Sequence, residues 1–264
     1  MSVSLIVMGA AGRMGSILAR LISEAPDLTL AAVLERPGHE DKLNAWEAGG
    51  TRVETDPAVA MTALPGAVVV DFTAPEATMS TARLAAAHGN PMVIGTTGLT
   101  DGNKAELSDL AKRVPLFLSP NMSVGVNVLL EVLPELTRLL GEAYDVELTE
   151  IHHKHKKDAP SGTAVRLAEA LAEARGWKLD ETARYGREGM VGERPHAEIG
   201  VHAVRGGDVV GVHTVYYMGP GERIEITHHA HSRENFANGA LRAARWLAGQ
   251  HPGRLYSMQD VLHA

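Results

Sequence analysis

The N-terminal half of the chain alternates short runs of β-branched apolar residues with Ala- and Leu-rich stretches of helical periodicity. This alternation is typical of successive β-α-β units, in which helices join parallel strands. Helices are expected to begin near Arg13, Pro75 and Asp101, each after a turn or capping sequence. The predicted strands cover residues 5–8, 28–34, 67–72, 92–95 and 116–118. Their polar or glycine-rich ends line one edge of an open parallel sheet, where ligands bind.

The pattern changes near residue 123. A helix over 126–140 and a strand over 146–151 come next, and glycine turns then separate strand-like runs between residues 198 and 227. These runs predict a mixed or antiparallel sheet, and a helix over 235–248 can return to the first domain. We therefore predict an α/β fold: a Rossmann-like doubly wound parallel sheet (1–123 and 233–264) with a second α+β domain built on a mixed sheet (124–232).

A glycine-rich turn, Gly9-Ala10-Ala11-Gly12-Arg13-Met14-Gly15, separates the first predicted strand from the first helix. In this context glycines let the backbone approach a pyrophosphate held at the helix N-terminus. Gly12 and Gly15 fit the last two glycines of the G-x-G-x-x-G pattern, whereas Ala10 stands at the first. A tight strand–helix turn with no nucleotide would use the same residues.

Glu35 ends the second predicted strand, 20 residues after Gly15, and Arg36 follows it. An acidic side chain at this distance can accept hydrogen bonds from an adenosine ribose, which favours NAD. An arginine can pair with a 2′-phosphate, which favours NADP. The pair leaves the choice between NAD and NADP open, and without the glycine-rich turn it would be an ordinary solvent-exposed ion pair.

Histidines and lysines are concentrated after the strand predicted at 146–151. Nine of the 13 histidines lie between residues 150 and 235, and His152-His153-Lys154-His155-Lys156-Lys157 is the densest run. If the strand continued, His152, Lys154 and Lys156 would share one face, but a loop would break that alternation. Pro160-Ser161-Gly162-Thr163 then opens a helix, whose free N–H groups and hydroxyls are suited to a carboxylate.

Three interpretations of this segment compete. It can be a solvent-exposed basic loop. It can be a metal site, since 152–155 and 228–231 each have the pattern H-H-x-H, although three nearby lysines would oppose a dication. It can supply acid catalysis beside an anionic substrate, since histidine and lysine can both donate protons. The last interpretation uses the most features, so no metal is predicted.

Composition excludes several classes of protein. The net charge of −7 argues against a protein that coats nucleic acid. Without cysteine there can be no disulfide, thiolate zinc site, iron–sulfur cluster or cysteine nucleophile. The N-terminus resembles a first strand and not a signal peptide, and no apolar run is long enough to span a membrane. We expect a cytoplasmic protein with no nucleic-acid or membrane partner.

Motifs along nearly the whole chain resemble the dihydrodipicolinate reductase (4-hydroxy-tetrahydrodipicolinate reductase) family of bacterial lysine and diaminopimelate biosynthesis. The string His152-His153-x-His155-Lys156 with Asp158-Ala159-Pro160-Ser161-Gly162-Thr163-Ala164 is the most specific of them. The glycine-rich turn, Asp71-Phe72-Thr73, Gly95-Thr96-Thr97-Gly98 and Ser119-Pro120-Asn121-Met122 agree with it. The resemblance continues through Arg187-Glu188-Gly189, Arg205 and Phe236-Ala237-Asn238-Gly239.

The resemblance implies an oxidoreductase that transfers hydride from NADH or NADPH to a cyclic unsaturated dicarboxylate imine, formed by dehydration of 4-hydroxy-tetrahydrodipicolinate, and releases tetrahydrodipicolinate. It implies catalytic roles for His152, as proton donor and acceptor, and for Lys156, as proton donor. It implies that His153, Gly162 and Thr163 bind the substrate. The implied cofactor-binding residues are Gly9, Ala10, Ala11, Gly12, Arg13, Met14, Glu35, Arg36, Gly95, Thr96, Thr97, Ser119, Pro120, Asn121 and Met122.

The resemblance also implies a homotetramer joined through the sheet of the second domain, which would bind substrate and form the assembly, while the first domain binds the dinucleotide. Two alternatives stay open: another NAD(P)-dependent reductase of a small cyclic or imine dicarboxylate, and a non-catalytic dinucleotide sensor. The sensor would have no use for His152 and Lys156. No role is assigned to His155, His229 or His231, and Asp71 and Arg205 are expected to be supporting residues.

Overall fold

The computed structural model describes residues 2–264, so Met1, the first residue of the predicted dinucleotide-binding domain, lies outside the described residues. The chain forms two compact units, Met1–Val124 with Arg233–Ala264, and Gly125–Ser232. The first unit ends at Val124, one residue after the boundary predicted between residues 123 and 124. Within the described part of the chain, no helix is both long enough and apolar enough to cross a membrane.

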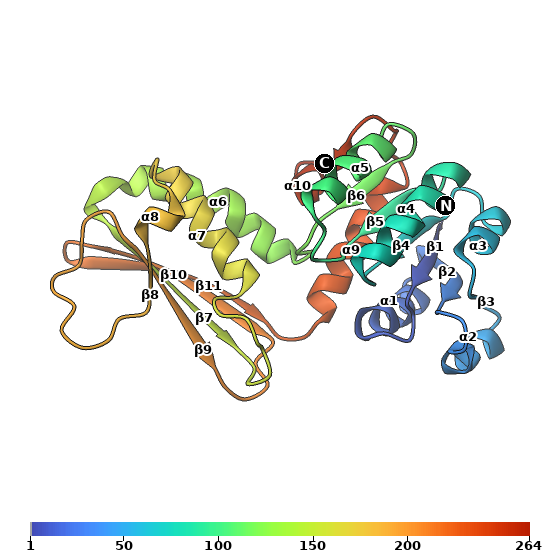
Figure 1. Cartoon of the computed structure of the whole chain (residues 1–264), viewed down its shortest axis with the longest axis horizontal. Coiled ribbons are helices and arrows are strands. Elements are labelled where there is room, and N and C mark those ends of the chain that lie inside the picture. The colour runs from blue at the N-terminus through green and yellow to red at the C-terminus, as the bar shows by residue number, and fades with distance from the viewer. Residues whose placement is uncertain (1) are drawn as a thin grey trace. The chain divides into compact units, whose positions relative to one another are not determined.

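The first unit is built on a seven-stranded parallel sheet in the order β12-β6-β5-β4-β1-β2-β3 (Figure 1). Its strands are β1 (Val3–Met8), β2 (Leu28–Leu34), β3 (Arg52–Glu54), β4 (Val68–Asp71), β5 (Met92–Ile94), β6 (Leu116–Leu118) and β12 (Leu255–Tyr256). Its helices are α1 (Arg13–Glu24), η1 (Glu40–Leu43), α2 (Asn44–Ala48), α3 (Pro57–Ala63), α4 (Pro75–His88), α5 (Asp101–Leu110), α9 (Glu234–Leu247) and α10 (Met258–Leu262). The predicted doubly wound α/β fold is confirmed.

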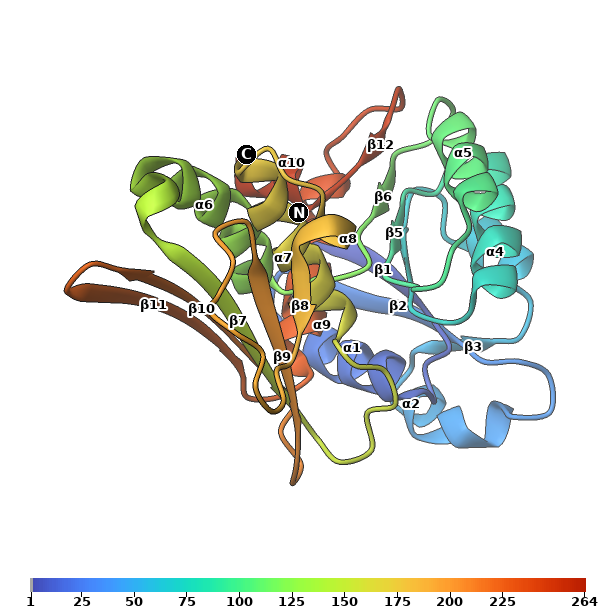
Figure 2. The ribbon, with the colours of Figure 1, turned by 60° about the vertical axis from the view of Figure 1, so that its left-hand side comes forward.

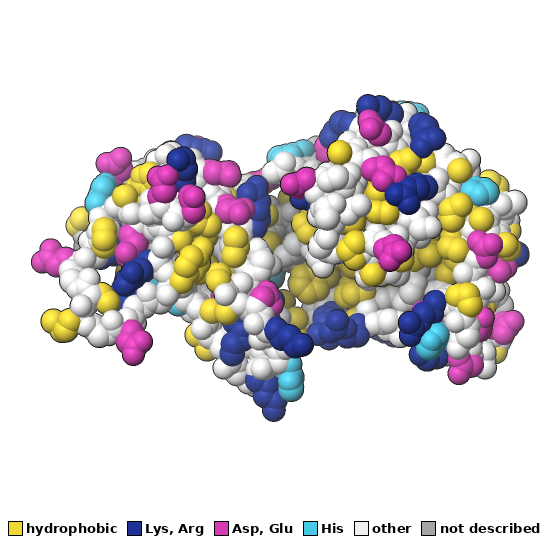
Figure 3. Space-filling view, viewed as in Figure 1, with side chains coloured by type: hydrophobic (Ala, Val, Ile, Leu, Met, Phe, Trp, Pro, Cys, Tyr) yellow, Lys and Arg dark blue, Asp and Glu magenta, His cyan; other side chains and the backbone are white. Residues whose placement is uncertain are grey.

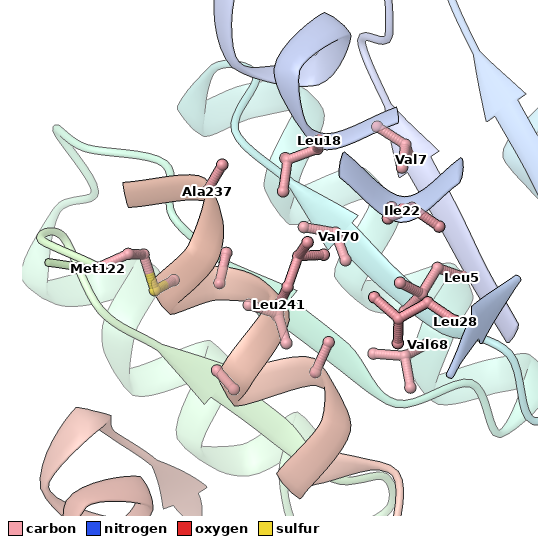
Figure 4. Packing of buried hydrophobic residues seen from close by; sticks show 14 of the residues in the cluster. Leu5, Val7, Leu18, Ile22, Leu28, Val68, Val70, Met122, Ala237 and Leu241 are labelled. Carbon is pink, nitrogen blue, oxygen red and sulfur yellow. The ribbon is translucent and has the colours of Figure 1, made fainter. Parts of the chain in front are cut away.

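Strand alternation places this sheet between two apolar layers. In β1, Leu5 and Val7 belong to one core cluster, while Ile6 between them belongs to the other. Because successive side chains of a strand point to opposite faces, a strand buried on both sides is a continuous apolar run. Helices α1 and α9 complete the first cluster, and α3, α4 and α5 complete the second. Figure 4 shows Leu18 of α1 and Leu241 of α9 packed with side chains of β1 and β4.

The second unit is a mixed five-stranded sheet in the order β11-β10-β7-β9-β8, with α6 and α7 along one face (Figures 1 and 2). Strand β10 pairs antiparallel with β7 and β11, while β7, β9 and β8 are parallel. Its strands are β7 (Asp145–His152), β8 (Ala183–Tyr185), β9 (Ile199–Arg205), β10 (Gly211–Gly219) and β11 (Glu222–Ala230). Its helices are α6 (Val124–Leu140), which begins at the last residue of the first unit, η2 (Gly141–Ala143), α7 (Gly162–Ala174) and α8 (Leu179–Thr182).

The core of the second unit is also set by alternation. Val146 and Leu148 of β7 and Val215 and Tyr217 of β10 all lie under the helices. Tyr217 is fully buried, and its hydroxyl lies 2.8 Å from Thr137 Oγ1 of α6, so the polar end of the largest buried side chain has a partner. This packing fixes β7, whose last residue, His152, is the first of the His/Lys run 152–157.

Candidate active site

The glycine-rich turn of the first unit is closed by backbone packing. Gly9 has φ +61°, a value that favours glycine, and its carbonyl accepts a hydrogen bond from Gly12 N at 2.9 Å. A Cβ on Gly15 would lie 2.2 Å from Gly9 O, so α1 can approach the turn only without a side chain at that position. Gly12 is the N-cap residue of α1, and no side-chain hydrogen bond is made at this cap. The first backbone N–H groups of the helix are therefore not capped by a side chain.

A pocket of about 630 Å³ opens beside this turn, within the first unit. Five of the predicted cofactor-binding residues line it: Gly9, Ala11, Gly12, Glu35 and Arg36. Thr73, from the motif Asp71-Phe72-Thr73, also lines it, as do residues that the sequence did not indicate, among them Lys42, Thr55 and Ser80. The pocket is suited to the adenosine and phosphate groups of a dinucleotide, because it is bordered by the glycine-rich turn, by the acidic Glu35 and by the cations Arg36 and Lys42.

The predicted residues that follow β5 and β6 do not line this pocket. Their strands are hydrogen-bonded neighbours, so they emerge at the same edge of the sheet. Gly95 is buried, and a Cβ there would lie 2.1 Å from the ring of Phe72, so only glycine fits at this position. Thr96 is buried and hydrogen-bonded to Thr78, whereas Thr97 is exposed. Gly95 and Thr96 therefore shape the end of β5, while Thr97 is free to contact a ligand.

Asp71, at the end of β4, is fully buried beside these residues. Its Oδ1 accepts hydrogen bonds from the backbone and hydroxyl of Thr73, at 2.7 and 2.6 Å. Burial raises the pKa of the Asp71 carboxyl, although the bonds from Thr73 oppose the rise. Because a Cβ on Gly9 would lie 2.9 Å from Thr73 Cγ2, Asp71 holds Thr73 against the glycine-rich turn.

The loop after β6 is anchored by helix α9. A Cβ on Gly239 would lie 1.7 Å from Met122 O, and the Met122 side chain is buried in the core beneath α9 (Figure 4). Ser119 is buried, and its hydroxyl donates to Asn121 O at 2.6 Å, while Pro120 is exposed. Of the remaining predicted cofactor-binding residues, Ala10 and Met14 pack into the core and Arg13 is exposed.

The histidine segment lies in the second unit. Strand β7 ends at His152, so a loop breaks the alternation considered for His152, Lys154 and Lys156. His152 Nδ1 lies 2.5 Å from Glu150 Oε2, and Glu150 is completely buried. Burial lowers the pKa of His152, and the neighbouring Glu150 carboxylate opposes that fall. His152 is thus a largely buried imidazole with one nitrogen held by a carboxylate.

The loop after His152 carries the lysines. Lys156 Nζ is paired with Asp158 Oδ2 at 2.9 Å and its side chain is 21% exposed. Lys154 and Lys157 are exposed, and Figure 3 shows Lys and Arg side chains gathered at this end of the second unit. His153 is held through its backbone, which donates to Val209 O at 2.8 Å, and its ring lies 6.2 Å from that of His155. An anion would meet several positive charges here.

The predicted substrate-binding residues Gly162 and Thr163 form the first turn of α7. Ser161 caps this helix by accepting a hydrogen bond from Ala164 N at 3.1 Å, as its Pro-Ser-Gly-Thr sequence predicts. Ser161 Oγ also lies 3.1 Å from His213 Nε2, and the His213 ring meets the His152 ring edge-on at 5.2 Å. The structure therefore brings the start of α7 to His152 and adds Glu150 and His213 to the site, together with Arg205, whose Nη1 donates a hydrogen bond to Glu150 Oε2 at 2.7 Å.

The metal interpretation gains no support from the geometry. Across residues 2–264, no group of three or more metal-ligating side chains is placed to hold an ion. His228 is half-buried on β11 opposite His213, while His229 and His231 are exposed with rings stacked at 6.4 Å.

The parallel sheet with its glycine-rich turn and the separate α+β unit with a buried histidine define a two-unit oxidoreductase of the dinucleotide-binding class. The family model for the N-terminus of dihydrodipicolinate reductase matches residues 3–122, and that for its C-terminus matches residues 125–262. The chain belongs to the dihydrodipicolinate reductase family.

Individual relatives match along their whole length. The chain is 64% identical over 261 residues to the 4-hydroxy-tetrahydrodipicolinate reductase of Nitratidesulfovibrio vulgaris (strain DP4), covering 99% of this chain and 100% of that one. It is 59% identical over 264 residues to that of Oleidesulfovibrio alaskensis, with the same coverage. A dipicolinate-bound dihydrodipicolinate reductase from Paenisporosarcina sp. TG-14 has a TM-score of 0.77 at 23% identity, covering 97% of this chain and 98% of that one.

Proposed function

We propose that this protein catalyses the NAD(P)H-dependent reduction of 4-hydroxy-tetrahydrodipicolinate, through its dehydrated imine, to tetrahydrodipicolinate in the diaminopimelate and lysine pathway. The observation that carries the proposal is His152, buried against Glu150 at the end of β7 and next to the N-terminus of α7. A titratable imidazole beside helix N–H groups and lysines suits protonation of an anionic substrate.

His152 and Lys156 are the proposed proton donors. Hydride addition to a conjugated imine places negative charge along the C=C–C=N system, which a positioned acid must neutralise. The reduced nicotinamide nucleotide supplies the hydride when it is bound. Lys156 is kept in its loop by Asp158, and its backbone N–H donates to His153 O at 3.1 Å, so its position relative to the end of β7 is fixed.

The first turn of α7 is the proposed carboxylate site. Gly162 is exposed and has no neighbouring atom within 4 Å of its Cβ position, so a ligand can approach the backbone there. Thr163 follows with a hydroxyl, and His153 is partly exposed in the preceding loop. N–H groups at a helix N-terminus bind anions well, and the exposed lysines add charge.

NADH and NADPH are both proposed as cofactors of the first unit. Glu35 would hydrogen-bond an adenosine ribose, while Arg36 and Lys42 would pair with a 2′-phosphate in the same pocket. Thr97 and Ser119 to Asn121 would contact the nicotinamide half at the ends of β5 and β6. The pocket and the histidine site belong to different units, so changes in one are expected to spare binding in the other.

The test is nicotinamide absorbance at 340 nm during reaction with substrate made in situ from pyruvate and aspartate semialdehyde by the preceding synthase, with NADH and NADPH in parallel. Oxidation that requires both this protein and the synthase product supports the assignment and gives the cofactor preference. If both nucleotides bind but neither is oxidised, the assignment is wrong, and another dicarboxylate imine or a sensing role replaces it.

We also propose that the protein is a cytoplasmic homotetramer joined through the second sheet. By alternation, Tyr216 and Met218 of β10 face away from α6 and α7, and Val204 of β9 is 45% exposed. Burial of such a face would stabilise an assembly. Sedimentation equilibrium of the wild type and of Val204→Glu tests this: the variant is expected to dissociate, and a monomeric wild type would exclude the tetramer.

A further inference from the structure

We propose that Glu150 is a positioning residue that fixes the ring orientation and tautomer of His152, so that Nε2 is the nitrogen that exchanges its proton with the substrate. The inference deepens the proposed function and rests on it for the role of His152. It assigns a function to a buried carboxylate that sequence analysis left without one.

The contact between the two side chains determines the tautomer. An ionised carboxylate can only accept hydrogen bonds, and Glu150 Oε2 lies 2.5 Å from His152 Nδ1. Nδ1 must therefore carry a hydrogen in both the neutral and the protonated ring. The nitrogen whose protonation changes is then Nε2, which is the arrangement that a proton donor needs.

Glu150 is itself held from both sides. Its Oε1 accepts hydrogen bonds from Ser161 N at 2.9 Å and from Arg205 Nη2 at 2.7 Å, and its Oε2 also accepts from Arg205 Nη1 at 2.7 Å. A bidentate arginine together with a backbone amide prevents rotation of the carboxylate. Arg205 Nη2 also donates to Asp158 O at 2.7 Å, so the same guanidinium supports the loop that carries Lys156.

The space beside Nε2 is kept clear by a glycine. A Cβ on Gly211 would lie 3.0 Å from His152 Nε2, closer than nine in ten such contacts, so alanine would press on the ring at the reacting nitrogen. This observation is independent of the hydrogen bonds to Nδ1. The two ring nitrogens therefore have different surroundings. Nδ1 is hydrogen-bonded to Glu150, and Nε2 faces Gly211, which has no side chain.

Several charges face His152 from the elements around it. They are Glu150 on β7, Lys156 in the following loop, which is paired with Asp158, and Arg205 on β9, while the titratable ring of His213 on β10 meets the His152 ring edge-on. Burial is the largest influence and lowers the pKa of His152, the cations lower it further, and Glu150 opposes both. Without the Glu150 charge, His152 would lose its proton at lower pH.

The experiment compares Glu150→Gln with Glu147→Gln. Glu147 is a matched control because it lies on the same strand, is also buried and is also bound by arginines, but it takes no part in the site. For Glu150→Gln, we expect kcat at pH 8 to fall at least tenfold with little change in KM, and the limb of the pH profile that reports protonated His152 to move down by about 1–3 units. Glu147→Gln should leave that limb in place, although both variants lose a buried ion pair.

Spectra of ¹⁵N-histidine-labelled protein, recorded without substrate, separate this inference from the proposed function. Two-bond ¹H–¹⁵N correlations, assigned by comparison with His152→Asn, are expected to show His152 protonated on Nδ1 in the wild type and a tautomer mixture in Glu150→Gln. If Glu150→Gln does not fold, Arg205→Lys, which keeps the charge but loses the bidentate grip, should give a partial mixture. An Nε2–H neutral tautomer in the wild type, or unchanged spectra and pH profile in the variants, would overturn the inference.

Discussion

Glu35 Oε2 accepts a hydrogen bond from the backbone N–H of Ala11 at 3.2 Å, which ties the end of β2 to the glycine-rich turn. Its other oxygen accepts from Arg36 N at 3.1 Å. Glu35 is only half-buried, and both Ala11 and Arg36 border the same pocket. The carboxylate therefore already occupies a hydrogen-bonding position at the pocket wall, where a ribose would need an acceptor.

Glu35 and Arg36 are expected to select between cofactors in opposite directions. Glu35→Ala should raise the Kd of NADH about tenfold and that of NADPH less, because a charge-assisted bond to the ribose is lost. Arg36→Ala should weaken NADPH more than NADH. Titration of nicotinamide fluorescence measures both constants, with exposed Glu40→Ala as the control. Equal changes for both nucleotides in each variant would contradict the assignment of these roles.

Lys156→Ala is expected to reduce kcat on the order of a hundredfold or more, because a proton donor near the reacting imine is removed. The Kd of NADH should stay within twofold, since the nucleotide pocket lies in the other unit. Lys157→Ala is the matched control, because it removes a neighbouring exposed lysine from the same loop. A similar loss in both variants would indicate that only the positive charge of the loop matters.

Gly15→Ala is expected to lower the melting temperature by several degrees and to weaken nucleotide binding. The added Cβ would meet the backbone of Gly9 and Ala10, so α1 or the turn must move. Gly102→Ala is the control: it lies in α5, where a Cβ makes only an ordinary contact at 3.7 Å, and alanine should be neutral or stabilising there. Calorimetry with and without NADH measures both effects, and an unchanged melting temperature in Gly15→Ala would contradict this account.

Local patterns in the sequence predict the main helices and strands, because the periodicity of apolar residues within each element sets its type. Leu5, Ile6 and Val7 form a continuous apolar run because the sheet is covered on both faces. By contrast, β3 has three residues at the edge of the sheet, too few to show a period, and the short segments around it were missed. Lys42 reaches the nucleotide pocket from one of those segments, so no pattern in the sequence indicated it.

The partners of His152 illustrate the same limit. Glu150 stands two residues before it on one strand, so alternation alone places both side chains on one face. Arg205 and His213 come from strands β9 and β10, and only the sheet register sets Arg205 opposite His152 and His213 opposite Glu150. Register depends on packing across the whole unit, which sequence spacing does not provide.

Glu147, three residues before Glu150, is expected to make the second unit sensitive to acid. Burial alone raises its pKa, but hydrogen bonds from Arg187, His202 and Arg194 outweigh burial and lower the pKa to about 2. Because the folded pKa lies below the unfolded value, the stabilisation is complete above about pH 5 and is lost as the pH falls toward 2. From the difference between the two pKa values it amounts to about 3 kcal/mol at neutral pH.

Urea unfolding at pH 7 and pH 3 tests this contribution. Trp177 is the only tryptophan of the second unit, and it becomes the only tryptophan of the chain, and so the fluorescence reporter of this unit, once Trp46 and Trp246 are changed to Phe. In that background, the free energy of unfolding at pH 7 should be lower for Glu147→Gln than for the protein that keeps Glu147. This difference in the free energy of unfolding should be smaller by about 2 kcal/mol at pH 3, because most of the stabilisation from the Glu147 carboxylate is lost at that pH. Exposed Glu135→Gln should show no such narrowing. A gap that is the same at both pH values would mean that Glu147 acts through packing and not through its charge.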